Sequence, residues 1–251
     1  MILIGILGTG HLAEMMVRGL QGTDYRFVLS PRGPETAARL SRQYGCEIAA
    51  SNQDVVDRCE GVFVALPAAQ GMAELSRLHF RPGQPVLSAM AGNHAQVLAA
   101  AIGPATGDMA MMPGYANALR VGPSILYPGT AFWRAFLGQV GPVHVLEKED
   151  QFVIAASFGA FSGASFAWMK AIIDWFTAQG LPSDLALSLV AGTLRGNAEV
   201  LLREGRSMES IRESVATPGG ITELLLGKLG EAEGLQAWAR GLDAVARRLK
   251  G

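Results

Sequence analysis

The feature that most constrains the fold of this chain is a glycine-rich turn within its first 22 residues. Residues 2–7 form a short apolar run with β-branched side chains, which predicts a buried strand. The turn follows at once and consists of Gly8, Thr9, Gly10, His11, Leu12 and Ala13. Residues 11–20 then have the apolar spacing of a helix. A strand, a GxGxxA turn and a helix in direct succession predict a dinucleotide-binding site.

Each small residue of this turn has a physical role in such a site. Gly8 allows the tight turn, Gly10 lets the backbone approach a pyrophosphate, and Ala13 keeps the helix close to the strand. The N-terminus of the helix offers unpaired N–H groups to the anion. The alternative is a turn that merely joins strand to helix, but its position and its setting favour the dinucleotide.

The end of the next expected strand, residues 25–29, bears on which dinucleotide binds. Sites that prefer NAD usually place Asp or Glu there to bind the ribose 2′-hydroxyl. Here Ser30 holds that place, and Arg32 lies two residues further on. A hydroxyl and a planar guanidinium suit a 2′-phosphate. The sequence therefore favours NADP over NAD, the alternative being that Arg32 is simply solvated in a proline-rich turn.

Two regions of the chain differ in pattern. Strands and helices alternate as far as Leu146, which predicts an α/β fold with an open, mostly parallel, doubly wound sheet. The later strands are expected at residues 47–50, 61–67, 85–92, 109–115, 124–127 and 142–146. After them only helices are expected, at residues 150–179, 182–204, 207–215, 221–229 and 230–249. The chain should therefore have a Rossmann-type domain at residues 1–149 and an all-α domain at residues 150–251.

Composition excludes several classes of function. The formal net charge of −1 provides no electrostatic footprint for nucleic acid or an anionic membrane. Two cysteines, Cys46 and Cys59, and no secretory signal before the first strand indicate buried thiols in a reducing cytoplasm. The four histidines lack metal-ligand spacing, so no metal site is expected.

One uncharged stretch resembles a membrane span. Residues 152–169 carry no charge and include the pair Gly159 and Gly163. Serines dilute the apolarity, however, and Lys170 and Asp174 follow on the same expected helix. A buried helix in a soluble dimer is therefore favoured over a bilayer span, because so apolar a helix cannot face water along its whole length.

Two segments of the helical region have the composition of a binding site. Residues 161–164 place serine and glycine inside the apolar helix, and residues 215–223 contain Pro218-Gly219-Gly220 between two helices. Such a turn has accessible N–H groups and suits a carboxylate. On spacing alone, an ordinary capped loop is an equal alternative.

The chain resembles the pyrroline-5-carboxylate reductases, NAD(P)H-dependent enzymes that make proline, almost from end to end. Residues 4–13 are similar to the opening fingerprint of that family, Ser30-Pro31-Arg32 to its Ser-x-Arg phosphate site, and residues 88–92 to its Ser-x-x-Ala-Gly segment. Residues 217–222 closely resemble Ser-Pro-Gly-Gly-Thr-Thr. The resemblance assigns coenzyme binding to Gly8, Thr9, Gly10, His11, Leu12, Ser30, Arg32, Asn52, Leu66, Pro67, Ala91 and Gly92.

The same resemblance implies a substrate site in the helical domain. Thr193 matches a threonine that hydrogen-bonds the imine nitrogen in the family. The substrate-binding residues implied are Ser162, Gly163, Thr217, Gly219, Gly220 and Thr222. Tyr115, which departs from the family pattern, is expected to reshape the pocket or to offer a hydroxyl of its own. Departures from the family pattern gather near the substrate: Leu66 replaces a lysine, residues 112–116 replace Met-Pro-Asn-Thr-Pro, and Ala164 replaces a proline.

The resemblance implies an NADPH-dependent reductase of a small cyclic imine carboxylate, pyrroline-5-carboxylate or a close analogue. Alternatives are a different imine or keto substrate, or a non-catalytic NADP-binding regulatory module. A related hydroxyacid dehydrogenase is disfavoured, because its catalytic lysine lies four residues after a glycine, whereas Lys170 lies seven after Gly163. The resemblance also implies a homodimer in which the C-terminal helices of two chains interlock.

Overall fold

The computed structural model describes residues 1–250 and divides into two compact units. The first unit contains Met1–Gly159 together with the last residues from Ala246, and the second contains Ala160–Val245. The domain boundary expected at residues 149 and 150 stays a prediction.

An eight-stranded sheet forms the centre of the first unit. Its order is β3-β2-β1-β4-β5-β6-β7-β8, and all neighbours are parallel except β6 and β7, which are antiparallel. The strands are β1 Ile2–Leu7, β2 Tyr25–Leu29, β3 Glu47–Ile48, β4 Gly61–Val64, β5 Pro85–Ser88, β6 Thr106–Met111, β7 Ser124–Tyr127 and β8 Val143–Val145. The expected open and mostly parallel sheet is confirmed.

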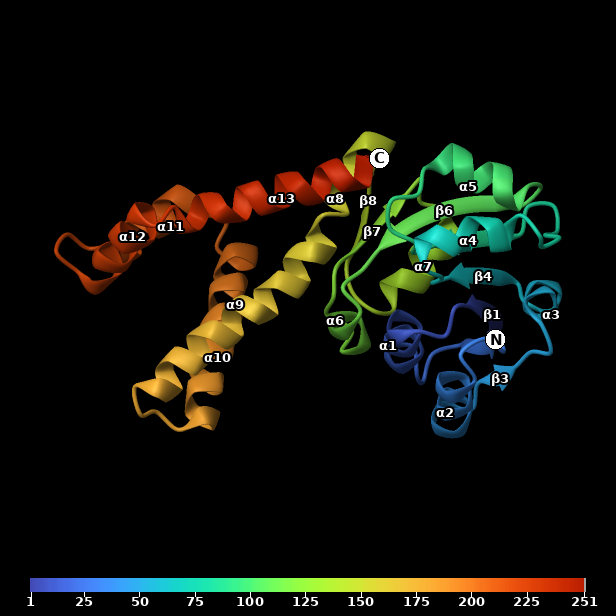
Figure 1. Ribbon diagram of the computed structural model, residues 1–251, viewed down its shortest axis with the longest axis horizontal. Coiled ribbons are helices and arrows are strands. Elements are labelled where there is room, and N and C mark those ends of the chain that lie inside the picture. The colour runs from blue at the N-terminus through green and yellow to red at the C-terminus, as the bar shows by residue number, and fades with distance from the viewer. Residues whose placement is uncertain (251) are drawn as a thin grey trace. The chain divides into compact units, whose positions relative to one another are not determined.

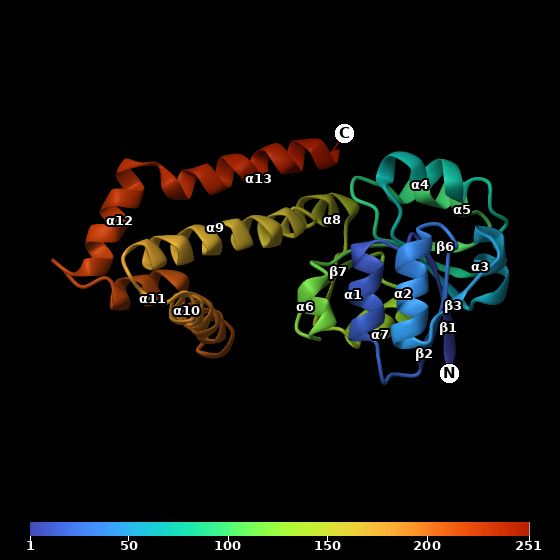
Figure 2. The ribbon, with the colours of Figure 1, turned by 60° about the horizontal axis from the view of Figure 1, so that its bottom comes forward.

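Helices cover both faces of this sheet (Figures 1 and 2). One buried apolar cluster joins the sheet to α1, α2 and α7, and a second joins its other face to α3, α4, α5 and α8. The helices of this unit are α1 His11–Gly19, α2 Pro34–Tyr44, α3 Asn52–Arg58, α4 Ala68–Leu75, α5 Ala95–Ile102, α6 Tyr115–Ala118, α7 Ala131–Gly138 and α8 Glu149–Ala155. Such a doubly wound arrangement leaves the carboxyl edge of the parallel strands open for a ligand.

Three strands end at least three residues earlier than the sequence suggested. The expected ends were residues 67, 92 and 115, whereas β4, β5 and β6 end at Val64, Ser88 and Met111. Pro67 caps α4 instead, and Gly92 and Gly114 have φ angles of +75° and +80°, which take the backbone out of the sheet. These early ends lengthen the loops at the carboxyl edge.

The remaining helices are α9 Phe158–Ala178, α10 Ser183–Arg203, α11 Met208–Val215, α12 Ile221–Glu231 and α13 Gly234–Lys250. Between residues 147 and 250 the structure contains no strand, as expected. The helix expected at residues 150–179 is interrupted, because α8 ends at Ala155 and α9 begins at Phe158. At this break the buried Ser157 Oγ has no hydrogen-bond partner among the described residues.

The long apolar helices are largely exposed in the single chain. Glu149–Ala178 and Ser183–Arg203 are each long and apolar enough to cross a membrane by length and composition alone. Within α9, Phe166, Trp168 and Trp175 are 56%, 43% and 59% exposed. The expected burial of this helix in a dimer stays a prediction.

Candidate active site

The glycine turn between β1 and α1 has the geometry expected of a pyrophosphate cradle. Gly8 has a φ of +97°, and a Cβ added there would lie 2.5 Å from the carbonyl oxygen of Ala65. Gly10 is the N-cap of α1 without a side-chain cap, and a Cβ there would meet open space. The first N–H groups of α1 therefore face a volume that an anion can enter.

Thr9 connects this turn to the loop after β2. Its hydroxyl donates to the carbonyl oxygen of Arg32 at 2.5 Å, and its side chain is buried. A Cβ at Gly33, the left-handed N-cap of α2, would lie 2.7 Å from Thr9 Oγ1. The two loops that would contact the pyrophosphate and the adenosine ribose are thus held together.

Ser30, directly after β2, and Asn52, the first residue of α3, form a buried pair. Ser30 Oγ donates to Asn52 Oδ1 at 2.6 Å, and the Arg32 backbone N–H donates to Ser30 Oγ at 3.3 Å. Both side chains are at least 93% buried. The Ser30 hydroxyl orients the Asn52 amide so that its NH₂ group faces away from the pair.

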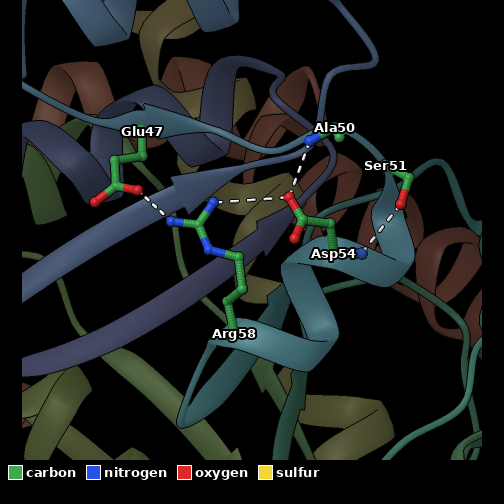
Figure 3. A network of polar contacts seen from close by, with 5 residues as sticks. All are labelled: Glu47, Ala50, Ser51, Asp54 and Arg58. Atoms are coloured by element: carbon green, nitrogen blue, oxygen red, sulfur yellow. Dashed lines mark hydrogen bonds and ion pairs between the residues drawn. The ribbon is translucent and has the colours of Figure 1, made fainter.

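A polar network fixes the start of α3, where Asn52 lies (Figure 3). Ser51 Oγ accepts from the Asp54 backbone N–H at 3.1 Å, and Asp54 Oδ2 accepts from the Ala50 N–H at 3.0 Å. Arg58 pairs with both Asp54 and Glu47, which ties α3 to β3. Ser51 thus caps α3, whereas the side chain of Asn52, the first residue of the helix, hydrogen-bonds Ser30.

One member of this site was missed by the sequence reasoning. Glu74, near the end of α4, accepts from Asn52 Nδ2 at 2.6 Å and pairs with Arg32 Nη1 at 3.0 Å. Its side chain is only 12% exposed, whereas that of Arg32 is 63% exposed. A glutamate 42 residues after Arg32, on a helix with no coenzyme motif, gives no sequence signal.

The ends of β4 and β5 supply the next part of the carboxyl edge. Leu66 and Pro67 follow β4, and a Cβ at Gly8 would lie 2.9 Å from the Leu66 backbone nitrogen. Ser88 Oγ accepts from the Met90 backbone N–H and from Asn93 Nδ2, which folds the turn containing Ala91 and Gly92. Both of these small residues are exposed. They leave room for a ring at the end of β5.

His11 and Tyr115 contact each other beside the glycine turn. Their ring centroids are 4.5 Å apart with planes tilted by 57°. The turn at Gly114 and a buried Asn117, whose Oδ1 accepts from the Gly114 N–H at 3.0 Å, hold Tyr115 at the start of α6. The structure thus places Tyr115, predicted for the substrate, against a residue predicted for the coenzyme.

The predicted substrate residues lie on separate elements of the second unit. Thr193 lines a cavity of about 390 Å³ between α9 and α10, with mostly apolar neighbours such as Trp168 and Leu189. Ser162 and Gly163 lie within α9, outside the residues that line this cavity. The structure of this unit does not bring Thr193 and this pair into one described cavity.

The Pro-Gly-Gly turn joins α11 and α12. Gly219 has a φ of +73°, and its N–H donates to Glu223 Oε2 at 2.7 Å. The Gly220 N–H donates to the Thr217 carbonyl at 2.9 Å, and Gly220 caps α12 without a side-chain hydrogen bond. Thr222 is half-buried in the first turn of α12. The first turn of α12, which has no side-chain cap, therefore keeps N–H groups that can donate hydrogen bonds to a carboxylate.

The sequence predicts no metal site. Among residues 1–250, no three His, Cys, Asp or Glu side chains lie together as a metal-binding group.

Comparison with known proteins identifies both regions of the chain. Residues 149–251 match the family model described as pyrroline-5-carboxylate reductase dimerisation, and residues 3–92 match that described as NADP oxidoreductase, coenzyme F420-dependent. Pyrroline-5-carboxylate reductase 1 of Bacillus spizizenii is 24% identical over 261 residues, covering 98% of this chain and 88% of the relative.

Two solved structures share the fold. That of 1-pyrroline-5-carboxylate reductase from Streptococcus pyogenes matches with a TM-score of 0.90 at 22% identity, over 99% of this chain and 98% of the other. That of Plasmodium falciparum pyrroline carboxylate reductase with NADP bound matches with a TM-score of 0.87 at 16% identity, over 99% and 97%. Because residues 149–251 match the pyrroline-5-carboxylate reductase model and the Bacillus spizizenii relative matches 98% of the chain, the chain belongs to the pyrroline-5-carboxylate reductase family.

Proposed function

We propose that the chain is an NADPH-dependent reductase of pyrroline-5-carboxylate or a close cyclic imine carboxylate. The observation that carries this proposal is the cradle formed by the glycine turn and the Ser30, Asn52 and Arg32 side chains. The turn fits the pyrophosphate of a dinucleotide, because it excludes a Cβ at Gly8 and leaves open space at Gly10. The family relatives supply the substrate class.

In this proposal each side chain at the carboxyl edge has a binding role. Gly8, Thr9 and Gly10 with the start of α1 hold the pyrophosphate, and Ser30, Arg32 and Asn52 hold the 2′-phosphate. The coenzyme supplies a hydride to the imine carbon when it is bound. The protein orients the reactants and excludes water. The remaining coenzyme contacts are assigned to His11, Leu12, Leu66, Pro67, Ala91 and Gly92.

We assign the substrate to the helical region. The Thr193 hydroxyl hydrogen-bonds the imine nitrogen and positions it as it becomes an amine. A threonine hydroxyl is too weak an acid to give up its proton at neutral pH, so Thr193 is a positioning group. The carboxylate is held by the turn at Thr217, Gly219, Gly220 and Thr222 and by Ser162 and Gly163. Tyr115 adds a contact from the coenzyme side.

The domain carrying these groups suggests the assembly. A dimerisation model matches residues 149–251, and the apolar side chains exposed on α9 need a covering partner. We therefore propose a homodimer through the C-terminal helices, with residues 1–149 as the dinucleotide-binding domain and residues 150–251 as the substrate and dimerisation domain. The cytoplasm is the proposed location.

Coenzyme oxidation tests this function. NADPH fluorescence is followed after addition of pyrroline-5-carboxylate, of piperideine carboxylate, and of 2-oxo acids with amines. We expect the fastest decay with pyrroline-5-carboxylate. A faster decay with another imine would assign that imine as the substrate in place of pyrroline-5-carboxylate. Binding of NADPH without turnover on any compound would instead support the non-catalytic module.

A further inference from the structure

We infer that Glu74 determines how strongly this protein distinguishes NADPH from NADH, because its carboxylate occupies the protein groups that a 2′-phosphate would use. The inference rests on the proposed function, which places the adenosine ribose at Ser30, Arg32 and Asn52. It adds a selectivity residue that lies outside every motif of the coenzyme site.

The carboxylate of Glu74 is held like a bound anion. Oε1 accepts from Asn52 Nδ2 at 2.6 Å, and Oε2 pairs with Arg32 Nη1 at 3.0 Å. The Ser30 hydroxyl donates to Asn52 Oδ1 at 2.6 Å, which fixes the amide so that its NH₂ group faces Glu74. The side chain of Glu74 is 12% exposed and that of Arg32 is 63% exposed, so the carboxylate is largely withdrawn from water while the guanidinium remains solvated.

The negative charge of Glu74 weakens the binding of a second anion beside Arg32 and Asn52. With Glu74 in place, its carboxylate already pairs with the positive charge of Arg32 and takes one amide hydrogen of Asn52. A phosphate dianion must therefore share these two groups with Glu74 or displace it, and a Glu74 carboxylate that stays nearby repels the phosphate.

An unphosphorylated ribose meets no such obstacle. Its 2′-hydroxyl is neutral and can donate a hydrogen bond to a carboxylate that remains where it is. Glu74 on α4 thus takes the part that an acidic residue at the end of β2 plays in NAD sites. The wild-type protein should therefore bind both coenzymes, with a preference for NADPH of less than about tenfold.

Direct binding tests this without reference to turnover. Dissociation constants for NADPH, NADH, 2′,5′-ADP and 5′-AMP are measured by calorimetry on the full-length wild type and on Glu74→Gln. The glutamine keeps the shape and one acceptor oxygen but removes the charge. We expect the ratio of NADH to NADPH dissociation constants to rise about tenfold in Glu74→Gln, with 2′,5′-ADP following NADPH.

The matched control is Asp24→Asn, which removes the same charge just before β2, at the opposite edge of the sheet. It should leave the ratio at its wild-type value. Glu74→Ala is the second variant, and it should shift the ratio in the same direction. Thermal unfolding of each variant checks that it is folded.

The possible results distinguish failure of the inference about Glu74 from failure of the proposed reductase activity. A ratio unchanged in folded Glu74→Gln and Glu74→Ala, or a wild-type preference for NADPH above about a hundredfold, overturns the inference even if the protein reduces pyrroline-5-carboxylate. A Glu74-dependent ratio in a protein that reduces none of the imines supports the inference while the proposed reductase activity fails. Absence of binding of all four nucleotides overturns both.

Discussion

At the scale of single residues, Gly8 and Gly10 differ in what they contribute although both belong to one turn. Gly8 has a left-handed φ, and its surroundings exclude a side chain, whereas Gly10 has neither constraint. We therefore expect Gly8 to be needed for the fold and Gly10 for access of the proposed coenzyme. Two alanine substitutions separate these roles.

We expect Gly8→Ala to lower the free energy of unfolding by about 2 kcal/mol or more, because the new Cβ meets the Ala65 carbonyl at an unfavourable φ. Gly10→Ala should cost less than about 1 kcal/mol but weaken NADPH binding about tenfold or more, since its Cβ stands where the pyrophosphate approaches. Urea denaturation and calorimetry measure the two effects. Equal loss of stability in both variants would contradict this division.

Thr193 is a second residue whose role a substitution can test. Thr193→Val keeps the shape but removes the hydroxyl, so kcat/KM for the imine should fall about tenfold, with the NADPH dissociation constant and the melting temperature unchanged. The control is Thr177→Val on α9, where the hydroxyl donates to its own helix at the Ile173 carbonyl. An unaltered kcat/KM in Thr193→Val would remove Thr193 from the substrate site.

At the scale of elements, the two cysteines show how the sheet separates its two cores. Cys46 belongs to the apolar cluster on one face of the sheet and Cys59 to the cluster on the other. Both are free and buried, as the sequence predicted. Burial raises the pKa of the Cys46 thiol to about 11 and that of Cys59 to about 12, from an ordinary value of 9.0.

Alkaline pH should therefore destabilise the fold through these thiols. Above pH 9 the thiols of the unfolded chain ionise, whereas the folded protein keeps them protonated until pH rises through about 11 and 12. The unfolded state thus binds fewer protons in this window, and the free energy of unfolding falls as pH rises. Urea midpoints at pH 7.5, 9 and 10 measure the slope. A double Cys46→Ala, Cys59→Ala variant should give a shallower slope, and an equal slope would assign the effect to other groups.

At the scale of the whole molecule, the single chain leaves much apolar surface uncovered in its helical region. No residue of α9, α12 or α13 is buried, and Leu224 and Leu225 on α12 are 66% and 60% exposed. A soluble protein rarely exposes so many large apolar groups on neighbouring turns. The dimerisation model that matches residues 149–251 supplies the explanation, a second copy of the chain.

Light scattering at micromolar concentration should therefore give twice the chain mass of 26.5 kDa. Leu225→Glu should shift the protein towards a single chain, because an ionised carboxylate is costly to bury in an apolar interface. Ala135→Glu, at an exposed position of α7 in the first unit, is the control and should leave the mass unchanged. A mass of 26.5 kDa for the wild type would overturn the proposed dimer.

The sequence by itself determined the fold class, the order of the strands along the chain, and the glycine turn between β1 and α1. These follow from local properties: apolar periodicity, the freedom of glycine at Gly8, and the order of strand, turn and helix are properties of neighbouring residues. The apolar pattern also predicted the bounds of β2 and β7, and the structure has the same bounds. The break between α8 and α9 carries no such local mark.

Only the tertiary structure decided which distant residues meet. Glu74 reaches Arg32 and Asn52 from another helix, and Tyr115 lies against His11 because α6 returns to the start of α1. The antiparallel direction of β7 against β6 is likewise a matter of chain path. Contacts between residues far apart in sequence depend on how helices pack over the sheet, and packing optimises burial summed over many side chains, so no short stretch of sequence specifies them.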